Sequence, residues 1–550
     1  MPYISGQPRK QKTMLPDCID DIISQDNPVR VIDAFINEMD MNELEFIRSA
    51  PKDTGRPGYD PRDILKLYIY GYFNNIRSSR KLMAECGRNI EVFFLLNRLT
   101  PDFRTISDFR KDNKGSIKLV FRSFADVCKK LNLYEKQLIA IDGTKIKAVN
   151  SKMNSYNKKT LAERIQRIDA NISRYLTQLD MNDESEEDDR EYTEEEIKGF
   201  IEKLKQRREK YVGFTNTLNK TGETQILTTD PEARVMHSKD GYHCSYNVQT
   251  AVDGGSHLIA EYEVTNNCTD QGLLNTVAQK AKKTLETSTI EVVADKGYDS
   301  RQDILKCLYN GTVPQVALKY DKTERLYNLE YKESKISEET KSSTKTEDIK
   351  KCLEAGVLPD CFEDTVVSVE VQEHNQLSCF ILNADTTVTC PMGNILNRIK
   401  MRGKNTVYAN KDACRQCPNR CTGSQSYKTV SFGPNTKYVP VKMYGNPRYE
   451  LQKIPKDIKQ NTPYNSLHRK DHPKKKVVLR IIKDKKKMKE RMCLSEHPFG
   501  TVKRHQGAYY LLCKGKEKAG AEMGLSFLVY NMKRAINMVG TEKLIEAMRG

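Results

Sequence analysis

The chain has 550 residues, and its 91 lysines and arginines outnumber its 74 aspartates and glutamates, which gives a net charge of +17. This length exceeds what one hydrophobic core usually organises, so we expect two or three domains. The basic excess favours a polyanionic partner, although charge alone also suits a well-solvated surface. The start is not like a signal peptide and no run of about 18 apolar residues occurs, so we expect a cytoplasmic protein with no membrane span.

Residues 1–125 predict a helical N-terminal domain. The segment that begins at Pro61 has apolar residues at intervals of three and four, and Ser78 with Ser79 is typical of a helix start. Basic residues flank these helices: Arg77, Arg80, Lys81 and Arg88. Such residues fit DNA binding and a solvated helix face equally well, so both interpretations stay open for this region.

Residues 131–320 predict the first part of a catalytic core. QLIAID is a short apolar strand, and SYNVQTAVD and HLIAEYEV form a hairpin-like pair around the turn at Asp253. A helix that begins at Asp270, the buried strand IEVVAD, a helix from Ser300 and the run VPQVAL follow. One strand, two strands, helix, strand, helix, strand is the order of a ribonuclease-H-like core, so the predicted fold class is α/β.

Two insertions interrupt this order, and residues 486–550 complete the core. Within 152–220, apolar residues recur at intervals of three or four on both sides of the acidic run DESEEDDRE, which predicts a coiled-coil-like helical hairpin. The second insertion, 321–485, contains the polar linker KESKISEETKSSTKTED, a cysteine cluster and the start of the basic stretch RKDHPKKKVVLRIIKDKKKMKER. Lysines of that stretch suit contact with DNA phosphates without reading the base sequence.

Two carboxylates stand at strand ends. Asp142 follows QLIAI and Asp295 follows IEVVA, on strands that we expect side by side, and Glu496 in EHPFGTVK supplies a third acid from a later helix. Carboxylate oxygens suit magnesium or manganese, and two such ions can serve the attacking and the leaving oxygen of a phosphodiester. Glu522 is the rival third carboxylate, and a surface ion pair with a nearby lysine is its alternative interpretation.

The segments IDGTKIKA, DPEARVMHSKDGYHCSYNVQTAVD, ADKGYDS and EHPFGTVK resemble those of bacterial insertion-sequence transposases of the DDE type, in the group with the motif Tyr-x2-Arg-x3-Glu-x6-Lys. The resemblance begins near Gly58, runs almost to the C-terminus and keeps the family's order of motifs. It implies a ribonuclease-H-like core, magnesium-dependent cleavage at terminal inverted repeats, and insertion into target DNA. Double-stranded DNA is then the partner, and because two ends must be paired, we expect a homodimer in the active complex.

The resemblance assigns roles to single residues. Asp142 and Asp295 match the two aspartates of the family and Glu496 its glutamate. Lys503, seven residues after Glu496, matches the lysine that is expected to contact a phosphate near the scissile bond. Tyr298 is a candidate for stacking on a displaced base, and core packing is the alternative for this aromatic residue.

The first half of the motif departs from the family pattern. Lys489 stands at the tyrosine position and Met492 at the arginine position, while Arg491 lies one residue early. We retain Arg491 as a candidate DNA-contacting residue.

The fifteen cysteines carry a separate signal, because four of them are clustered. Cys390 in CPMG is followed by CRQCPNRC, which contains Cys414, Cys417 and Cys421. This set can supply four thiolates to one tetrahedral structural zinc. Since one half of the set offers a single cysteine, free thiols are the alternative.

Two other functions fit the same residues. One is a metal-dependent DNA nuclease that does not join strands, and terminal inverted repeats beside the coding region would favour a transposase over it. The other is a non-catalytic, zinc-stabilised DNA-binding protein, which would bind DNA equally well without the three carboxylates.

Overall fold

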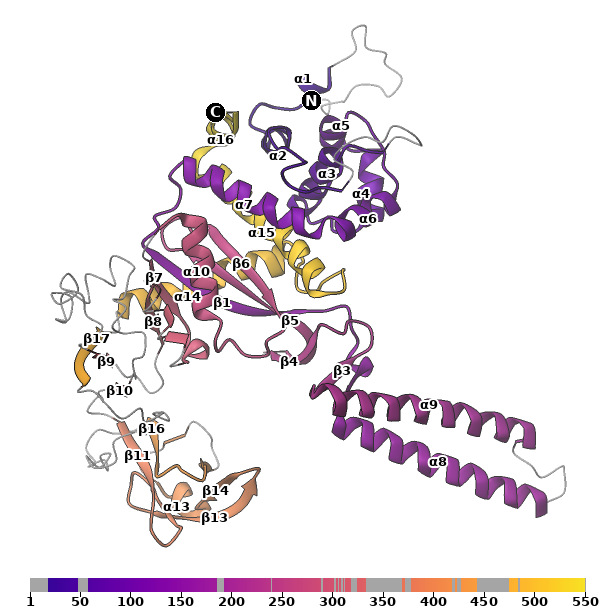
Figure 1. Cartoon of the computed structure of the whole chain (residues 1–550), viewed down its shortest axis with the longest axis vertical. Coiled ribbons are helices and arrows are strands. Elements are labelled where there is room, and N and C mark those ends of the chain that lie inside the picture. Colours follow the sequence, from indigo (N-terminus) through magenta and orange to yellow (C-terminus); the bar gives the residue numbers. More distant parts are fainter. Residues whose placement is uncertain are drawn as a thin grey trace, which may run out of the picture.

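A computed structural model shows a mixed α/β protein (Figure 1). The structure describes residues 18–47, 58–184, 192–238, 240–287, 290–300, 303–304, 306–307, 310, 312–317, 324–332, 368–370, 377–417, 421–422, 427–442, 474–482 and 485–549. None of the helices in these ranges is both long enough and apolar enough to cross a bilayer.

A six-stranded mixed sheet lies at the centre. Strand β5 (Gly241–Asp253) pairs antiparallel with β1 (Leu138–Lys147) on one side and with β4 (Arg234–Ser238) and β6 (Ile259–Thr265) on the other. Strand β7 (Ile290–Ala294) runs parallel to β1, and β8 (Thr312–Val316) runs parallel to β7. The strands predicted from QLIAID to VPQVAL are therefore all present, and in the predicted order.

Helices cover both faces of the sheet. Because neighbouring strand residues point to opposite faces, the fully buried run Ile139–Ile141 marks β1 as covered on both. Helix α10 (Leu274–Leu285) packs on one face, and α14 (Lys485–Gly500) packs on the other by setting Leu494 against Ala140 and β7. Helix α10 begins four residues later than predicted, because Gly272 has a φ of +81° and the Asp270 side chain is engaged elsewhere.

The N-terminal helices and the C-terminal helices share one hydrophobic core with the sheet. Helix α15 (Lys516–Val539) packs against α7 (Lys114–Lys130), α3 (Pro61–Phe73) and β6, and α16 (Thr541–Arg549) packs against α2 (Pro28–Asn37). Proline at the first helical position and a capping aspartate or asparagine start α3 and α2. The N-terminal helices are α1 (Ile19–Ile22), α2 (Pro28–Asn37), α3 (Pro61–Phe73), α4 (Ser79–Cys86), α5 (Ile90–Leu96), α6 (Phe103–Asp112) and α7 (Lys114–Lys130).

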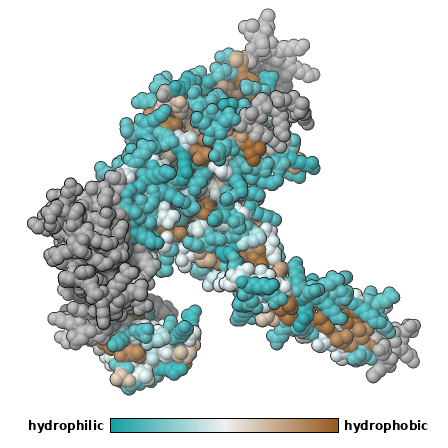
Figure 2. Space-filling model, viewed as in Figure 1, coloured by the Kyte–Doolittle hydropathy of each residue, from teal (hydrophilic) through white to brown (hydrophobic). Residues whose placement is uncertain are grey.

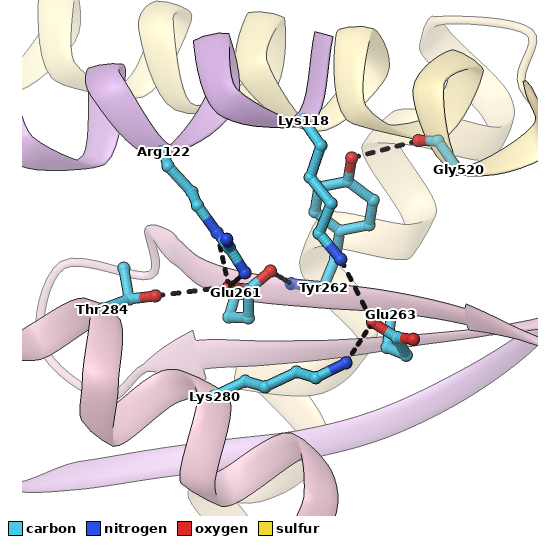
Figure 3. A network of polar contacts seen from close by, with 8 residues as sticks. All are labelled: Lys118, Arg122, Glu261, Tyr262, Glu263, Lys280, Thr284 and Gly520. Carbon is cyan, nitrogen blue, oxygen red and sulfur yellow. Dashed lines mark hydrogen bonds and ion pairs between the residues drawn. The ribbon is translucent and has the colours of Figure 1, made fainter. Parts of the chain in front are cut away.

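Ion pairs fasten α7 to the sheet, as Figure 3 shows. Arg122 forms an ion pair with Glu261, which is 1% exposed, with 3.0 Å between the guanidinium nitrogen and the carboxylate oxygen. The ammonium groups of Lys118 and Lys280 both pair with the Glu263 carboxylate, at 3.2 Å and 2.7 Å. Between them the Tyr262 hydroxyl donates 3.1 Å to a carbonyl oxygen of α15. The helical layer is therefore joined to β6 by charged as well as apolar contacts.

Close packing between α15 and β6 predicts a stability difference between two glycines of one helix. A Cβ on Gly524 would lie 2.4 Å from the Tyr262 hydroxyl oxygen, whereas a Cβ on Gly520 would meet nothing within 4 Å. We expect Gly524→Ala to destabilise the core by about 1–3 kcal/mol through overpacking. Gly520→Ala should be neutral or stabilise by up to about 1 kcal/mol. Melting temperatures of the two variants check this, and equal values would contradict it.

A helical hairpin leaves the sheet between β1 and β5. It consists of α8 (Lys158–Glu184) and α9 (Glu194–Thr221), with β2 (Ser155–Asn157) and β3 (Gln225–Leu227) paired at its base. Figure 1 shows the two helices side by side and pointing away from the sheet, and Figure 2 shows hydrophilic residues along much of their visible face. Most of the acidic run between them lies outside the described residues.

The segment between β8 and α14 contains two further sheets. Strand β9 (Glu324–Lys332) pairs with β10 (Ser368–Glu370) and with β17 (Lys474–Ile482). The antiparallel pair of β9 and β17 therefore forms both the start and the end of this inserted segment. The second sheet has its own core and carries α13 (Lys411–Arg415). Its strands are β11 (Leu377–Leu382), β12 (Val388–Thr389), β13 (Ile395–Arg402), β14 (Asn405–Ala409), β15 (Val430–Phe432) and β16 (Tyr438–Lys442). The polar linker and most side chains of the basic stretch lie outside the described residues.

Candidate active site

Asp142 and Asp295 meet at one edge of the sheet. The parallel ladder between β1 and β7 ends at the pair Ile141 and Ala294, so the two aspartates are the next residue of each segment. Neighbouring strands lie about 4.8 Å apart. The structure therefore brings together the two carboxylates that the strand-end pattern predicts as a pair.

Asp142 lies in a largely buried and negatively charged setting. Burial raises the pKa of its carboxyl group to about 6, and the charge of Asp295 acts in the same direction. The Gly143 N–H donates a hydrogen bond of 2.8 Å to Asp142 Oδ1, which offsets part of the rise. A carboxyl group whose pKa is raised by burial and by a neighbouring like charge is typical of a functional site.

Asp295 begins a short turn that ends at Tyr298. Its Oδ1 accepts a hydrogen bond of 2.7 Å from the Gly297 N–H. Tyr298 is fully buried, and its hydroxyl donates to Gln249 Oε1. Of the two interpretations that the sequence leaves open for Tyr298, this geometry favours core packing over base stacking.

Asp270 is a residue of this edge that the sequence analysis missed. Its Oδ1 accepts hydrogen bonds from Lys145 at 3.0 Å, from Asn247 at 2.8 Å and from Gln249 at 2.9 Å. A Cβ at position 143 would lie 2.1 Å from the Gln249 amide nitrogen, so only glycine fits there. The available signal was the pair of amide side chains, Asn247 and Gln249, which stand two residues apart and therefore on one face of β5.

Helix α14 places two polar side chains beside Asp142. Arg491 and Ser495 are four residues apart and so lie on one face of the helix, and both favour the ionised form of Asp142. Within the described part of the chain, Arg491 Nε makes no hydrogen bond. A buried donor without a partner beside carboxylates fits a site that takes a charged ligand.

Glu496 is the neighbour of Ser495, and its side chain is exposed. Its Cα is about 3.8 Å from that of Ser495. Across the described ranges, no three histidine, cysteine, aspartate or glutamate side chains form a group that could hold a metal ion as they stand. The structure thus brings Asp142 and Asp295 together and leaves Glu496 on the adjacent surface of α14.

Lys503 reaches the same edge from the end of α14. Pro498 lacks an N–H, and the helix ends in a π-helical turn, η8 (Thr501–His505). From this turn the Lys503 ammonium donates to Thr144 Oγ1 and, at 3.4 Å, to the carbonyl oxygen of Lys145. Thr144 is two residues after Asp142, so Lys503 lies along β1 close to the carboxylate pair.

Glu522, the rival third carboxylate, is committed to another task. It is 1% exposed, forms an ion pair with the buried Arg77, and accepts hydrogen bonds of 2.9–3.1 Å from the N–H groups of Leu512 and Cys513. The expected surface pair with a lysine is therefore wrong, because α15 turns this side chain inward. Arg77 is not a solvated residue either. This geometry favours Glu496 as the third acid.

The four clustered cysteines line one small pocket of the second sheet. Burial raises the pKa of Cys421 to about 11, and the neighbouring thiols of Cys414 and Cys390 contribute to the rise. Cys390 and Cys421 also pack against the core of this sheet. Four soft sulfur donors around one pocket suit zinc by type and number, although their side chains do not form a closed metal-binding group here.

Comparisons with known proteins identify two regions. A family model described as a transposase domain (DUF772) matches residues 17–112, and one described as a transposase DDE domain matches residues 133–381. No curated protein matches the chain. A solved structure titled "Cryo-EM structure of piggyBac transposase synaptic complex with hairpin DNA" is similar at 9% identity and a TM-score of 0.28, over 95% of this chain and 79% of that chain.

The two family models together account for more than half of the chain, and the second spans the strands that lead to Asp142 and Asp295. They confirm the resemblance drawn from the sequence motifs: the chain belongs to the transposases of the DDE type.

Proposed function

We propose that this transposase cuts DNA at the terminal inverted repeats of its own insertion sequence and joins the freed 3′-hydroxyl ends to target DNA. The observation that carries the proposal is the register of β1 and β7, which sets Asp142 beside Asp295. The order β6-β5-β1-β7-β8 supports a ribonuclease-H-like core around this pair.

The residues of this edge fit divalent metal ions. Asp142 and Asp295 offer the hard oxygen donors that magnesium and manganese prefer, and a cation beside them would relieve the repulsion that contributes to the raised pKa of Asp142. We assign Asp142, Asp295 and Glu496 as the residues that would hold two ions. When bound, such ions supply charge stabilisation for the attacking and leaving oxygens.

The basic residues around the pair bind the DNA backbone in this proposal. Arg491 Nε is buried beside Asp142 without a hydrogen bond among the described residues, and a phosphate oxygen suits such a donor. Lys503 approaches from the other side, along β1. Between them they would fix the scissile phosphate against the carboxylates. The active complex pairs two DNA ends, so we propose a homodimer, which acts in the cytoplasm where bacterial DNA lies.

One assay tests this function. Purified protein, a duplex that carries the flanking element end, and a target plasmid are incubated with magnesium, with calcium or with EDTA, and the products are resolved on denaturing gels. We expect nicks at the element end and joined products with magnesium only. Nicks without joined products would favour the nuclease, and binding without any metal-dependent cleavage would favour the non-catalytic DNA-binding protein.

We also propose that Cys390, Cys414, Cys417 and Cys421 bind one structural zinc ion, because all four line one pocket. Since binding energy in such a site is folding energy, Cys417→Ser should lower the zinc content from about one per chain and lower the melting temperature of this sheet. Elemental analysis and thermal unfolding measure both effects. Cys268→Ser, at an exposed cysteine elsewhere, is the control. Zinc-free protein with unchanged melting would refute the proposal.

A further inference from the structure

Two tyrosines that belong to none of the recognised motifs stand exposed near the carboxylate pair. Tyr509 is 54% exposed and Tyr510 is 41% exposed, and their rings meet edge to face with centroids 4.8 Å apart. Both lie in the loop between the π-helical turn and α15. Side chains of this size are usually buried at least in part, so an adjacent exposed pair suggests a surface that binds something.

The loop occupies a defined place on the sheet. Strand β7 pairs with β1 only as far as Ile141, and further along the same strand the loop takes over. The Lys147 N–H donates 3.2 Å to the Tyr509 carbonyl, and the Leu511 N–H donates 2.8 Å to the Lys147 carbonyl. Lys147 is five residues after Asp142, which corresponds to about 16 Å along a strand. The tyrosines are thus fixed at a short distance from the acids.

The buried ion pair between Arg77 and Glu522 fixes the backbone of the loop. Glu522 accepts the N–H groups of Leu512 and Cys513, and Arg77 donates to the carbonyl oxygens of Gly507 and Tyr510. The Arg77 guanidinium also lies over the Tyr510 ring, 5.0 Å from its centroid. A loop fixed by so many contacts presents its side chains with little conformational entropy left to lose on binding.

The surroundings of the pair are basic. Arg504 precedes it in the π-helical turn, and Lys514 and Lys516 follow it, all three exposed. Exposed aromatic rings interleaved with cationic side chains are the combination that binds unpaired bases and their phosphates. A partner protein with an apolar surface would not call for this density of positive charge.

On these grounds we propose that Tyr509 and Tyr510 form a stacking platform for an unpaired base of the DNA end. The base lies within about five nucleotide steps of the scissile phosphate, since about 16 Å spans that many steps at 3.4 Å each. Tyr509 presents the open ring, while Tyr510, covered by Arg77, braces it. This inference rests on the proposed function, because it names how the same site handles its DNA substrate.

The test measures binding without cleavage, in calcium, on an end-bearing duplex with 2-aminopurine at successive positions within five steps of the cleavage site. The variants are Tyr509→Ala, Tyr509→Phe and Tyr510→Ala, with Tyr192→Ala as the matched control. Tyr192 is 37% exposed and lies near the tip of the helical hairpin. We expect Tyr509→Ala to raise the Kd for DNA by a factor between about five and about a hundred, which is the range expected for the loss of one stacked base.

The remaining variants separate stacking from other roles. Tyr509→Phe keeps the ring and should bind within about twofold of the wild type. Tyr509→Ala should leave the salt dependence of binding unchanged, because the phenol releases no counterions, whereas Arg504→Ala should reduce that dependence. In the wild type, 2-aminopurine fluorescence should change at one or two positions, and Tyr509→Ala should abolish that change.

Three outcomes overturn the inference. Tyr509→Ala that binds like Tyr192→Ala would remove the platform, and a fluorescence signal that survives in both alanine variants would assign the unpaired base to another residue. If the alanine variants change the oligomeric mass of the DNA-free protein in solution but not its affinity for DNA, the tyrosine pair is a protein interface. If the wild type binds no end-bearing DNA, the proposed function fails as well, which the first assay reveals independently.

Discussion

Asp142→Asn is expected to lower magnesium-dependent cleavage on the order of a thousandfold or more while DNA binding survives. Asparagine keeps the size of the side chain and the oxygen that accepts the Gly143 N–H, but it removes the negative charge next to Asp295. Asp295→Asn should behave in the same way. Gel-shift and nicking assays on one end-bearing duplex measure both quantities. Cleavage near the wild-type rate in either variant would contradict the assignment of these two aspartates as metal ligands.

The same substitution should stabilise the metal-free protein. The folded-state pKa of Asp142 is raised to about 6, above its value in an unfolded chain. Ionisation of this carboxyl group therefore lowers the free energy of unfolding progressively as the pH rises from about 4 to about 6. In EDTA at pH 7, Asp142→Asn should be more stable than the wild type by about 1–3 kcal/mol, and the difference should vanish below about pH 4. Asp126→Asn, on the exposed face of α7, should show neither effect.

Glu522→Gln is expected to lower folding stability, whereas Glu496→Gln is expected to abolish cleavage without lowering stability. Glutamine at position 522 leaves the Arg77 guanidinium buried without a counter-charge, which costs about 3–5 kcal/mol of folding stability. Glutamine at position 496 changes an exposed side chain, so stability should stay within about 0.5 kcal/mol of the wild type while cleavage is abolished. Urea unfolding and nicking assays on both variants separate the two roles.

A clear result would also refute this assignment. If Glu522→Gln folds with wild-type stability but no longer cleaves, the third carboxylate comes from α15. If Glu496→Gln cleaves normally, α14 contributes only Ser495 and Arg491 to the edge.

The strand order and the aspartate pair could be predicted because their signals are local. An apolar run followed by an aspartate identifies a strand end, and parallel pairing then brings two such ends together without further information. Helix α15 carries a similar local signal, because Met523, Phe527, Tyr530 and Ala535 recur at helical spacing and are all buried, although Met538 is 44% exposed near the helix end.

Other features depend on contacts between distant parts of the chain. Asp270 meets Lys145 only through the register of three strands, and the amide pair in β5 does not by itself show which carboxylate it binds. The fate of Glu522 is set by Arg77, which lies 445 residues away in sequence. The exposed orientation of Glu496 depends on which face of α14 packs on β1, and the weak amphipathicity of a lysine-rich helix does not determine that face.

The shared core of the two chain ends has a consequence for synthesis and truncation. Helix α16 packs against α2, and the Thr541 hydroxyl donates 3.0 Å to the carbonyl oxygen of Asp26. The N-terminal helices therefore cannot complete their packing until α16 has been synthesised. A gene copy that has lost the codons of α15 and α16 would yield a chain with exposed apolar surface on α2, α3, α7 and β6, open to degradation, rather than a weakened enzyme. A stop codon just ahead of α15 should thus silence such a copy as completely as one much earlier in the gene.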